Sequence, residues 1–127
     1  MLLSEAIRLG ALLHEQAFGM LVDHEGRTCA AGAALEAIGM LPVYDHRPLI
    51  ITDLLMEPHF PIWSLTPRIR PGGPMPPGER LGSLVMWLND VLRWPREAIA
   101  DWVQEVELRE EELIRQEKAE SQVEACA

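Results

Sequence analysis

The chain has few of the residues on which cross-links and export depend. Only Cys29 and Cys126 are cysteines, and they lie far apart in the sequence. Two cysteines make no disulfide scaffold, so the sequence predicts a protein of the reducing cytoplasm. No signal peptide is expected, because residues 1–5 have neither a basic region nor a long apolar run. No apolar run approaches the ~20 residues that cross a membrane, so no membrane association is expected.

Basic residues are also scarce. The chain has 11 Lys and Arg against 20 Asp and Glu, a net charge of −9. Residues 104–127 hold eight acids and three bases, a net of −5, which leaves −4 for residues 1–103. Such a balance repels phosphate backbones and anionic lipid, so direct nucleic-acid binding is disfavoured.

Motifs that carry chemistry are absent as well. The chain has no phosphate-binding loop, dinucleotide fingerprint, nucleophile elbow or paired-carboxylate motif. The sequence therefore predicts no cofactor. It leaves open whether the protein is an enzyme, although the absence of these motifs argues against catalysis.

The clearest pattern present is a pair of helices over residues 81–107. The first helix has an apolar face formed by Leu81, Leu84, Val85, Leu88 and Leu92. The second repeats that pattern with Ile99, Trp102, Val103 and Val106. Pro95 suits the first turn of a helix and disfavours helical geometry at Trp94, so we expect a corner between the two.

Two more helices are expected near the N-terminus. Residues 4–14 have Ser4 as a predicted N-cap. Residues 28–39 begin at a predicted cap, Thr28, and end at Gly39, which suits a left-handed stop. The many small residues of this second helix predict close approach of a neighbouring helix, at the centre of the fold.

The remaining segments complete a mainly α bundle of four or five helices with at most one short hairpin. Residues 49–57 predict a short helix, and residues 18–22 a brief strand followed by a turn. The 61–78 loop is rich in proline, which excludes regular structure. We expect a compact domain over 1–107 and an acidic helical extension over 108–127.

The Pro-rich loop has its own candidate contacts. Trp63 and Ile69 are expected to anchor it to the core. Its neighbourhood holds the chain's basic cluster, formed by Arg68, Arg70 and Arg80. Long loops in small domains are usually functional or tied down.

The long C-terminal helix leads to the main functional hypothesis. Its apolar stripe thins after Val106, and the pairs Glu105–Arg109 and Glu111–Arg115 favour a solvated helix. We expect a non-enzymatic interaction module that self-associates or docks on a partner protein through this helix and the Pro-rich loop. The predicted interface residues are Trp87, Ile99, Trp102, Val106 and Leu113.

A thiol-based enzyme or redox sensor at Cys29 is the first alternative. A helix N-terminus lowers the pKa of a thiol, and His24 is near enough in sequence to be its base. The competing interpretation is a small buried residue in an Ala-rich helix.

The histidines do not predict a metal site. The chain has His14, His24, His46 and His59, and none has ligand spacing with another. A site assembled from His46, His59 and Asp45 stays a weaker alternative.

The corner over residues 92–100 resembles a helix-turn-helix in outline. The outward face of its second helix is expected to carry Arg96, Glu97, Asp101, Gln104 and Glu105. Acids there oppose contact with phosphate, so DNA reading is disfavoured. A regulatory factor that acts on a nucleic-acid machine through protein contacts is the second alternative.

Two segments resemble a family of small uncharacterised bacterial and phage proteins. The first segment combines residues 3–11 with the Thr-Cys-Ala-x-Gly-Ala-Ala helix at 28–34. The second combines Leu-Asn-Asp at 88–90 with Trp-x-Arg-Glu-x-Ile-Ala-Asp-Trp-Val at 94–103. The resemblance leaves the middle and the tail unmatched.

This resemblance implies a lost metal site. Many members of the family carry a Cys-x-x-Cys pair and two histidines that suit zinc. Here the histidine positions hold Trp87 and Leu92, and no Cys-x-x-Cys exists. The resemblance thus implies apolar packing in place of the metal, with the Pro-rich loop folded over Trp87, and it implies no activity.

Overall fold

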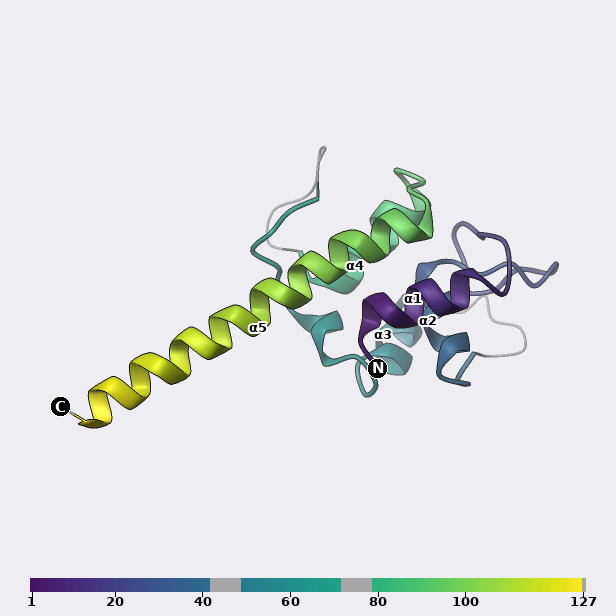
Figure 1. Cartoon of the computed structure of the whole chain (residues 1–127). Coiled ribbons are helices and arrows are strands. Elements are labelled where there is room, and N and C mark those ends of the chain that lie inside the picture. The colour runs from purple at the N-terminus through teal and green to yellow at the C-terminus, as the bar shows by residue number, and fades with distance from the viewer. Residues whose placement is uncertain (42–48, 72–78, 127) are drawn as a thin grey trace.

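The computed structural model describes residues 1–41, 49–71 and 79–126 (Figure 1). In these ranges the elements are α1 (Leu3–Ala11), α2 (Ala30–Ala37), α3 (Leu49–Met56), the 3-10 helix η1 (Pro61–Ser64), α4 (Leu81–Asp90) and α5 (Arg96–Cys126). The predicted mainly α fold with a long C-terminal helix is confirmed. The brief strand expected at 18–22 does not form, because Val22 and Gln16 make only single bridges to Thr28.

The helices α1 and α2 pack closely because Gly10 of α1 faces the backbone of α2. A Cβ atom added to Gly10 of α1 would lie 1.9 Å from the carbonyl oxygen of Ala33 in α2. α1 also packs against α5, so it lies between the central helix and the C-terminal helix. The prediction of a central helix of small residues is supported, since Ala30, Ala31, Ala33 and Ala34 are fully buried.

The helix ends differ in part from those predicted. The N-cap of α1 is Leu2, which makes no side-chain capping bond, and Ser4 lies within the first turn. The N-cap of α2 is Cys29 in place of Thr28. Gly39 has a φ of 74°, so the left-handed position predicted after α2 is present.

The predicted corner lies between α4 and α5. α4 ends at Asp90, Arg93 takes a left-handed φ of 55°, and α5 begins directly after Pro95. The Trp94 N–H donates to the Leu88 carbonyl at 2.9 Å, which closes the turn. The Arg93 guanidinium lies 4.5 Å from the centre of the Phe18 ring, a cation–π contact between this corner and the segment before α2.

Two buried polar side chains tie this corner to the N-terminal half. Asn89 is fully buried, and its amide NH2 donates to Ala17 O at 3.0 Å. Its oxygen accepts from Ala30 N–H at 3.1 Å and from the Gln16 amide at 2.9 Å. One asparagine side chain therefore joins α4, the loop after α1, and the start of α2.

Arg96 is the second such residue, and its position corrects an expectation. It was predicted on the outward face of α5, yet only 7% of it is exposed. Its guanidinium donates to the carbonyls of Thr28 at 3.1 Å and Ala11 at 3.4 Å, and to that of His14. Ala11 is the last residue of α1, where free carbonyls favour a cation, and His14 lies in the turn that follows. Burial lowers the pKa of this guanidinium.

The Pro-rich loop is partly ordered by contacts with the core. Its start forms η1, so the expectation of no regular structure is wrong there. Trp63 is buried, and its indole N–H donates to Asp53 at 2.8 Å. The Ile69 carbonyl accepts from the Trp102 indole at 3.2 Å. The two predicted anchors are thus in contact with the body, whereas residues 72–78 lie outside the described residues.

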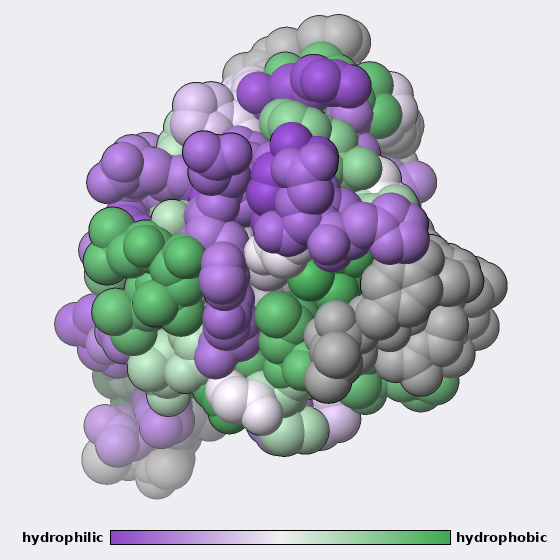
Figure 2. Space-filling model, turned by 90° about the vertical axis from the view of Figure 1, so that its right-hand side faces the viewer, coloured by the Kyte–Doolittle hydropathy of each residue, from purple (hydrophilic) through white to green (hydrophobic). Residues whose placement is uncertain are grey.

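α5 leaves the body as a single long helix (Figure 1). Its 31 residues correspond to about 46 Å at 1.5 Å per residue. The predicted pair Glu111–Arg115 is present at 3.5 Å, while Arg109 pairs with Glu112 in place of Glu105. Figure 2 shows the opposite end of the molecule, where hydrophobic areas are interrupted by polar side chains.

Candidate functional site

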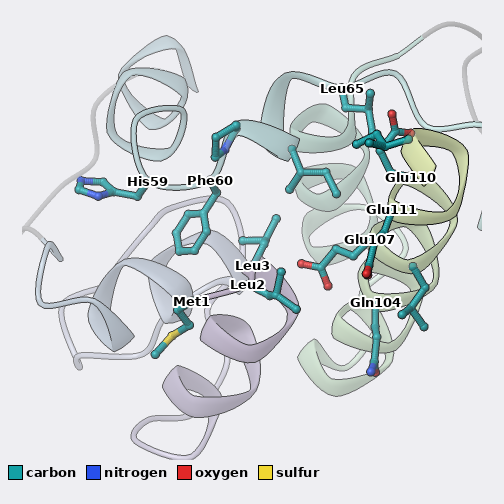
Figure 3. Close-up of a pocket in the computed structure, with 14 residues that line it drawn as sticks. Met1, Leu2, Leu3, His59, Phe60, Leu65, Gln104, Glu107, Glu110 and Glu111 are labelled. Carbon is teal, nitrogen blue, oxygen red and sulfur yellow. The ribbon is translucent and has the colours of Figure 1, made fainter. Parts of the chain in front are cut away.

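A groove with a volume of about 590 Å³ lies between α5 and the N-terminal end of α1 (Figure 3). We call it the α5 groove. One wall comes from the N-terminus and the segment around η1, with Met1, Leu2, Leu3, His59, Phe60, Pro61, Ile62 and Leu65. The other wall comes from α5, with Gln104, Glu107, Leu108, Glu110, Glu111 and Ile114.

The floor of the groove is made by the protein's own core. Leu3 is 1% exposed and Phe60 is 2% exposed, so both are already packed. Their positions follow from local structure, because Leu3 opens the apolar face of α1 and Phe60 accepts the first hydrogen bond of η1 from Trp63 N–H. The groove therefore has a built apolar base.

The sides of the groove leave apolar side chains in water. Leu108 and Ile114 of α5 are 57% and 46% exposed, and Met1 and Leu2 are 62% and 52% exposed. Each buried Å² of apolar surface is worth about 25 cal/mol, so covering these four side chains together would be favourable. Exposed apolar surface gathered in a concavity is typical of a binding site.

The carboxylate of Glu107 lies inside this groove and serves α1. It accepts hydrogen bonds from Ser4 N–H at 3.3 Å and from the Ser4 hydroxyl. Figure 3 shows Glu107 extending from α5 toward Leu2 and Leu3. Glu107 thus supplies the negative charge and the acceptor that the first turn of α1 needs, and it holds the two walls of the groove together.

The edge of the groove is acidic. Glu110 makes no ion pair with any described residue, and Glu111 contacts only the solvated side chain of Arg115 at 3.5 Å. The lining residues that the structure describes include no Lys or Arg. Glu107, Glu110 and Glu111 therefore form an acidic edge beside the apolar base, and the described residues that line the groove add no Lys or Arg to it.

The interface residues predicted from the sequence fall in two groups. Ile99 is 0% exposed, Trp102 is 5% exposed and Val106 is 3% exposed, so these three belong to the core of the domain and present no free surface. Leu113 is half-buried and keeps accessible surface. The prediction was wrong for the first three because α1 and the Pro-rich loop cover the stripe that they form.

Sequence reasoning missed the apolar residues that do remain open on α5. Leu108 and Ile114 lie outside the stripe that runs through Val106 to Leu113. The signal for them was two large apolar residues placed off that stripe in an otherwise charged helix.

The remaining predicted interface residue, Trp87, is half-buried in a different place. It lines a smaller pocket of about 330 Å³ together with Met20, Thr52 and Asp90. Its indole N–H is buried and has no hydrogen-bond partner in the part of the chain that the structure describes. The described part of the Pro-rich loop does not line this pocket. The loop packs on Trp102 instead of Trp87, as far as residue 71.

The environment of Cys29 opposes thiol chemistry. The side chain is 0% exposed, and burial raises the pKa of its thiol from 9.0 to about 11. The Gly32 N–H at the start of α2 donates to the sulfur at 3.4 Å and lowers the pKa of the thiol, but by less than burial raises it. His24 is exposed in the turn over residues 23–27. The alternative interpretation of Cys29 as a small buried residue fits better.

The described residues contain no group of three or more His, Cys, Asp or Glu side chains placed to hold a metal ion. His46 and Asp45 of the weaker metal alternative lie outside the described residues. The ring of His14 contacts the carboxylate of Glu36 at 2.8 Å. Within the described ranges, no helix combines the length and apolarity required for a membrane span.

Comparison of the chain with protein-family models, with curated proteins and with solved structures finds no match. The resemblance to small bacterial and phage proteins therefore stays a prediction. Arguments about function depend on the groove and the helix themselves.

Proposed function

We propose that this protein is a non-enzymatic interaction module that docks on another protein through the α5 groove. The observation that carries the proposal is the exposure of Leu108 and Ile114 beside a packed apolar base. Both side chains belong to a helix that continues past the body, so a partner can reach them without rearranging the core.

Several features support a docking role over a catalytic one. The groove joins apolar side chains to carboxylates, and no described histidine, cysteine or lysine other than His59 lines it. The buried thiol of Cys29 lies elsewhere and has a raised pKa. We place the protein in the cytoplasm, where a free buried thiol such as Cys29 stays reduced.

Self-association through α5 is the other form of this hypothesis. The free part of the helix is strongly acidic, with a net charge of −5 over residues 104–127. Two copies paired along it would bring like charges together. We therefore favour a different protein as the partner, and action on a nucleic-acid machine stays a prediction within that class.

Site-specific photo-crosslinking in the native host tests the proposal. A photoreactive residue replaces Leu108 or Ile114 in the groove, and replaces Leu12, which is 82% exposed, as the matched control. We expect one defined protein adduct from each groove position and none from the control. Equal labelling at all three positions, or no adduct at any, would contradict a docking role for the groove.

A further inference from the structure

We propose that the occupant of the α5 groove is a basic amphipathic helix of another protein. This inference depends on the proposed docking function and adds the chemistry of the partner. The groove gives three observations that point to it: the length of its helical wall, its apolar base, and the three carboxylates along its edge.

The length and shape of the groove suit a helix. The α5 wall runs from Gln104 to Ile114, which is about 15 Å or three turns at 1.5 Å per residue. A helix placed alongside α5 presents one apolar side chain per turn at i, i+3 or i+4, and i+7. Leu3 and Phe60 form a base on which such side chains can pack, and Leu108 and Ile114 can flank them.

The charge of the groove determines which residues should lie beside the apolar face of that helix. Glu107 points into the groove, and its hydrogen bonds with Ser4 orient the carboxylate before a partner binds. Glu110 has no ion pair among the described residues, and Glu111 has only the long contact with Arg115. Lys or Arg beside the apolar face of the occupant would meet these groups, which favours association and orients the partner.

The same charges argue against other occupants. A second copy of the chain would bring its own Glu110 and Glu111 to a two-fold interface, where each faces like charge. An anionic membrane surface would be repelled in the same way. A basic helix alone satisfies both the apolar base and the carboxylate edge.

Designed peptides test the inference with the full chain. One synthetic helix of about 14 residues carries Leu at i, i+4, i+7 and i+11 with Lys on both flanks, and its matched control carries Glu in place of Lys. Fluorescence anisotropy of labelled peptide measures binding. We expect the basic peptide to bind and to weaken as salt is raised, and the acidic peptide to bind at least about tenfold more weakly. Equal binding of both would overturn the inference.

Paired charge reversals locate the binding. The double variant Glu110→Lys, Glu111→Lys changes the groove, and Glu117→Lys, Glu120→Lys makes the same change of net charge farther along α5. The groove variant should lose about tenfold affinity for the basic peptide and gain affinity for the acidic one, while the control variant should stay within about twofold. The gain shows that the variant is folded. Equal losses in both variants would mean attraction to the acidic helix as a whole and would overturn the inference.

Failure of this inference differs from failure of the docking function. Defined crosslinks at positions 108 and 114 with no preference for the basic peptide would leave the docking function standing and reject the basic helix. Crosslinks to a second copy of the chain would assign the groove to a dimer interface and reject a different partner. No crosslink and no peptide binding would reject both proposals.

Discussion

Glu107 of α5 caps α1 through Ser4, although the two residues lie 103 positions apart in the chain. The carboxylate accepts from the Ser4 N–H at 3.3 Å and from the Ser4 hydroxyl. Leu2, at the N-cap, has no side chain that can accept a hydrogen bond. A tertiary contact thus performs the function that a local cap performs in most helices.

Replacing Glu107 with Ala should lower the free energy of unfolding by about 1–2 kcal/mol, because α1 loses both an acceptor and a favourable charge. Urea denaturation followed by far-UV circular dichroism measures the change. Glu105→Ala is the control, since that side chain is exposed on the same helix and should change stability by less than about 0.5 kcal/mol. Equal effects of the two substitutions would mean that Glu107 is no cap.

The sequence could predict the helices but not this cap. Apolar periodicity predicted α4 and α5, and the expected cap, the stop glycine and the small residues predicted α2. These patterns could not place Glu107 against Ser4, since contact between distant residues depends on how helices pack and not on local pattern. The α5 groove was missed for the same reason: its two walls come from opposite ends of the chain and from the segment around η1.

Replacing Asn89, the chain's only asparagine, with Ala should cost about 2–4 kcal/mol of unfolding free energy. The substitution leaves the buried Ala30 N–H and Ala17 carbonyl without their partner and opens a small cavity. Urea denaturation measures this change in the free energy of unfolding. Val91→Ala, at a site 54% exposed, should change stability by less than about 0.5 kcal/mol. A loss below about 1 kcal/mol for Asn89→Ala would show that water replaces the amide easily.

Asn89 was placed correctly on α4 by the sequence, but its role was not. Its position beside Leu88 places it on the buried side of α4, but the pattern carries no sign of the backbone groups that it bonds. Arg96 shows the opposite error, because a charge at the start of a helix was expected to face solvent. The carbonyls at the end of α1 draw it inward, and those carbonyls carry no sequence signal.

Cys29 should make stability depend on alkaline pH. Its pKa is raised from 9.0 to about 11 by burial, so the native thiol stays protonated where the unfolded thiol ionises. Stability is therefore unaffected below pH 9 and falls between pH 9 and 11, by about 2 kcal/mol in total. The measurement is urea denaturation against pH, and the difference between Cys29 and Cys29→Ala proteins isolates this thiol from other groups that titrate there.

The chemical reactivity of Cys29 provides a second test of the burial of its thiol. In a Cys126→Ser protein, iodoacetamide at pH 8 should leave Cys29 unmodified until denaturant is added. Rapid alkylation of the native protein would contradict the buried state and would restore the thiol-enzyme alternative.

Gly10→Ala should destabilise the protein although alanine is the better helix former. The new Cβ would lie 1.9 Å from the Ala33 carbonyl oxygen, so α1 and α2 must separate, at a cost of about 2–3 kcal/mol. Gly39→Ala is the comparison: it meets no atom within 4 Å and strains only the left-handed backbone, for about 1 kcal/mol. Thermal unfolding ranks the two variants. An increase in Tm for Gly10→Ala would show that the helices do not approach this closely.

The part of α5 beyond residue 116 should be dispensable for folding, whereas the part that directly follows residue 105 should not be. A chain that ends at residue 116 keeps Val106, Glu107 and the whole α5 wall of the groove, so its unfolding free energy should lie within about 0.5 kcal/mol of the full chain. A chain that ends at residue 105 loses the burial of Val106, which is 3% exposed, and the cap on Ser4. That chain should be less stable by about 3 kcal/mol.

Urea denaturation of both truncated proteins separates a solvated extension from an integral helix. Helix content should fall in proportion to the residues removed in the longer protein, and more steeply in the shorter one, because α1 loses its support. Binding of the basic peptide should survive in the chain that ends at residue 116, since the groove is complete at Ile114. Loss of stability in that chain would mean that residues beyond 116 pack on the body, and the predicted boundary at residue 107 would then be wrong.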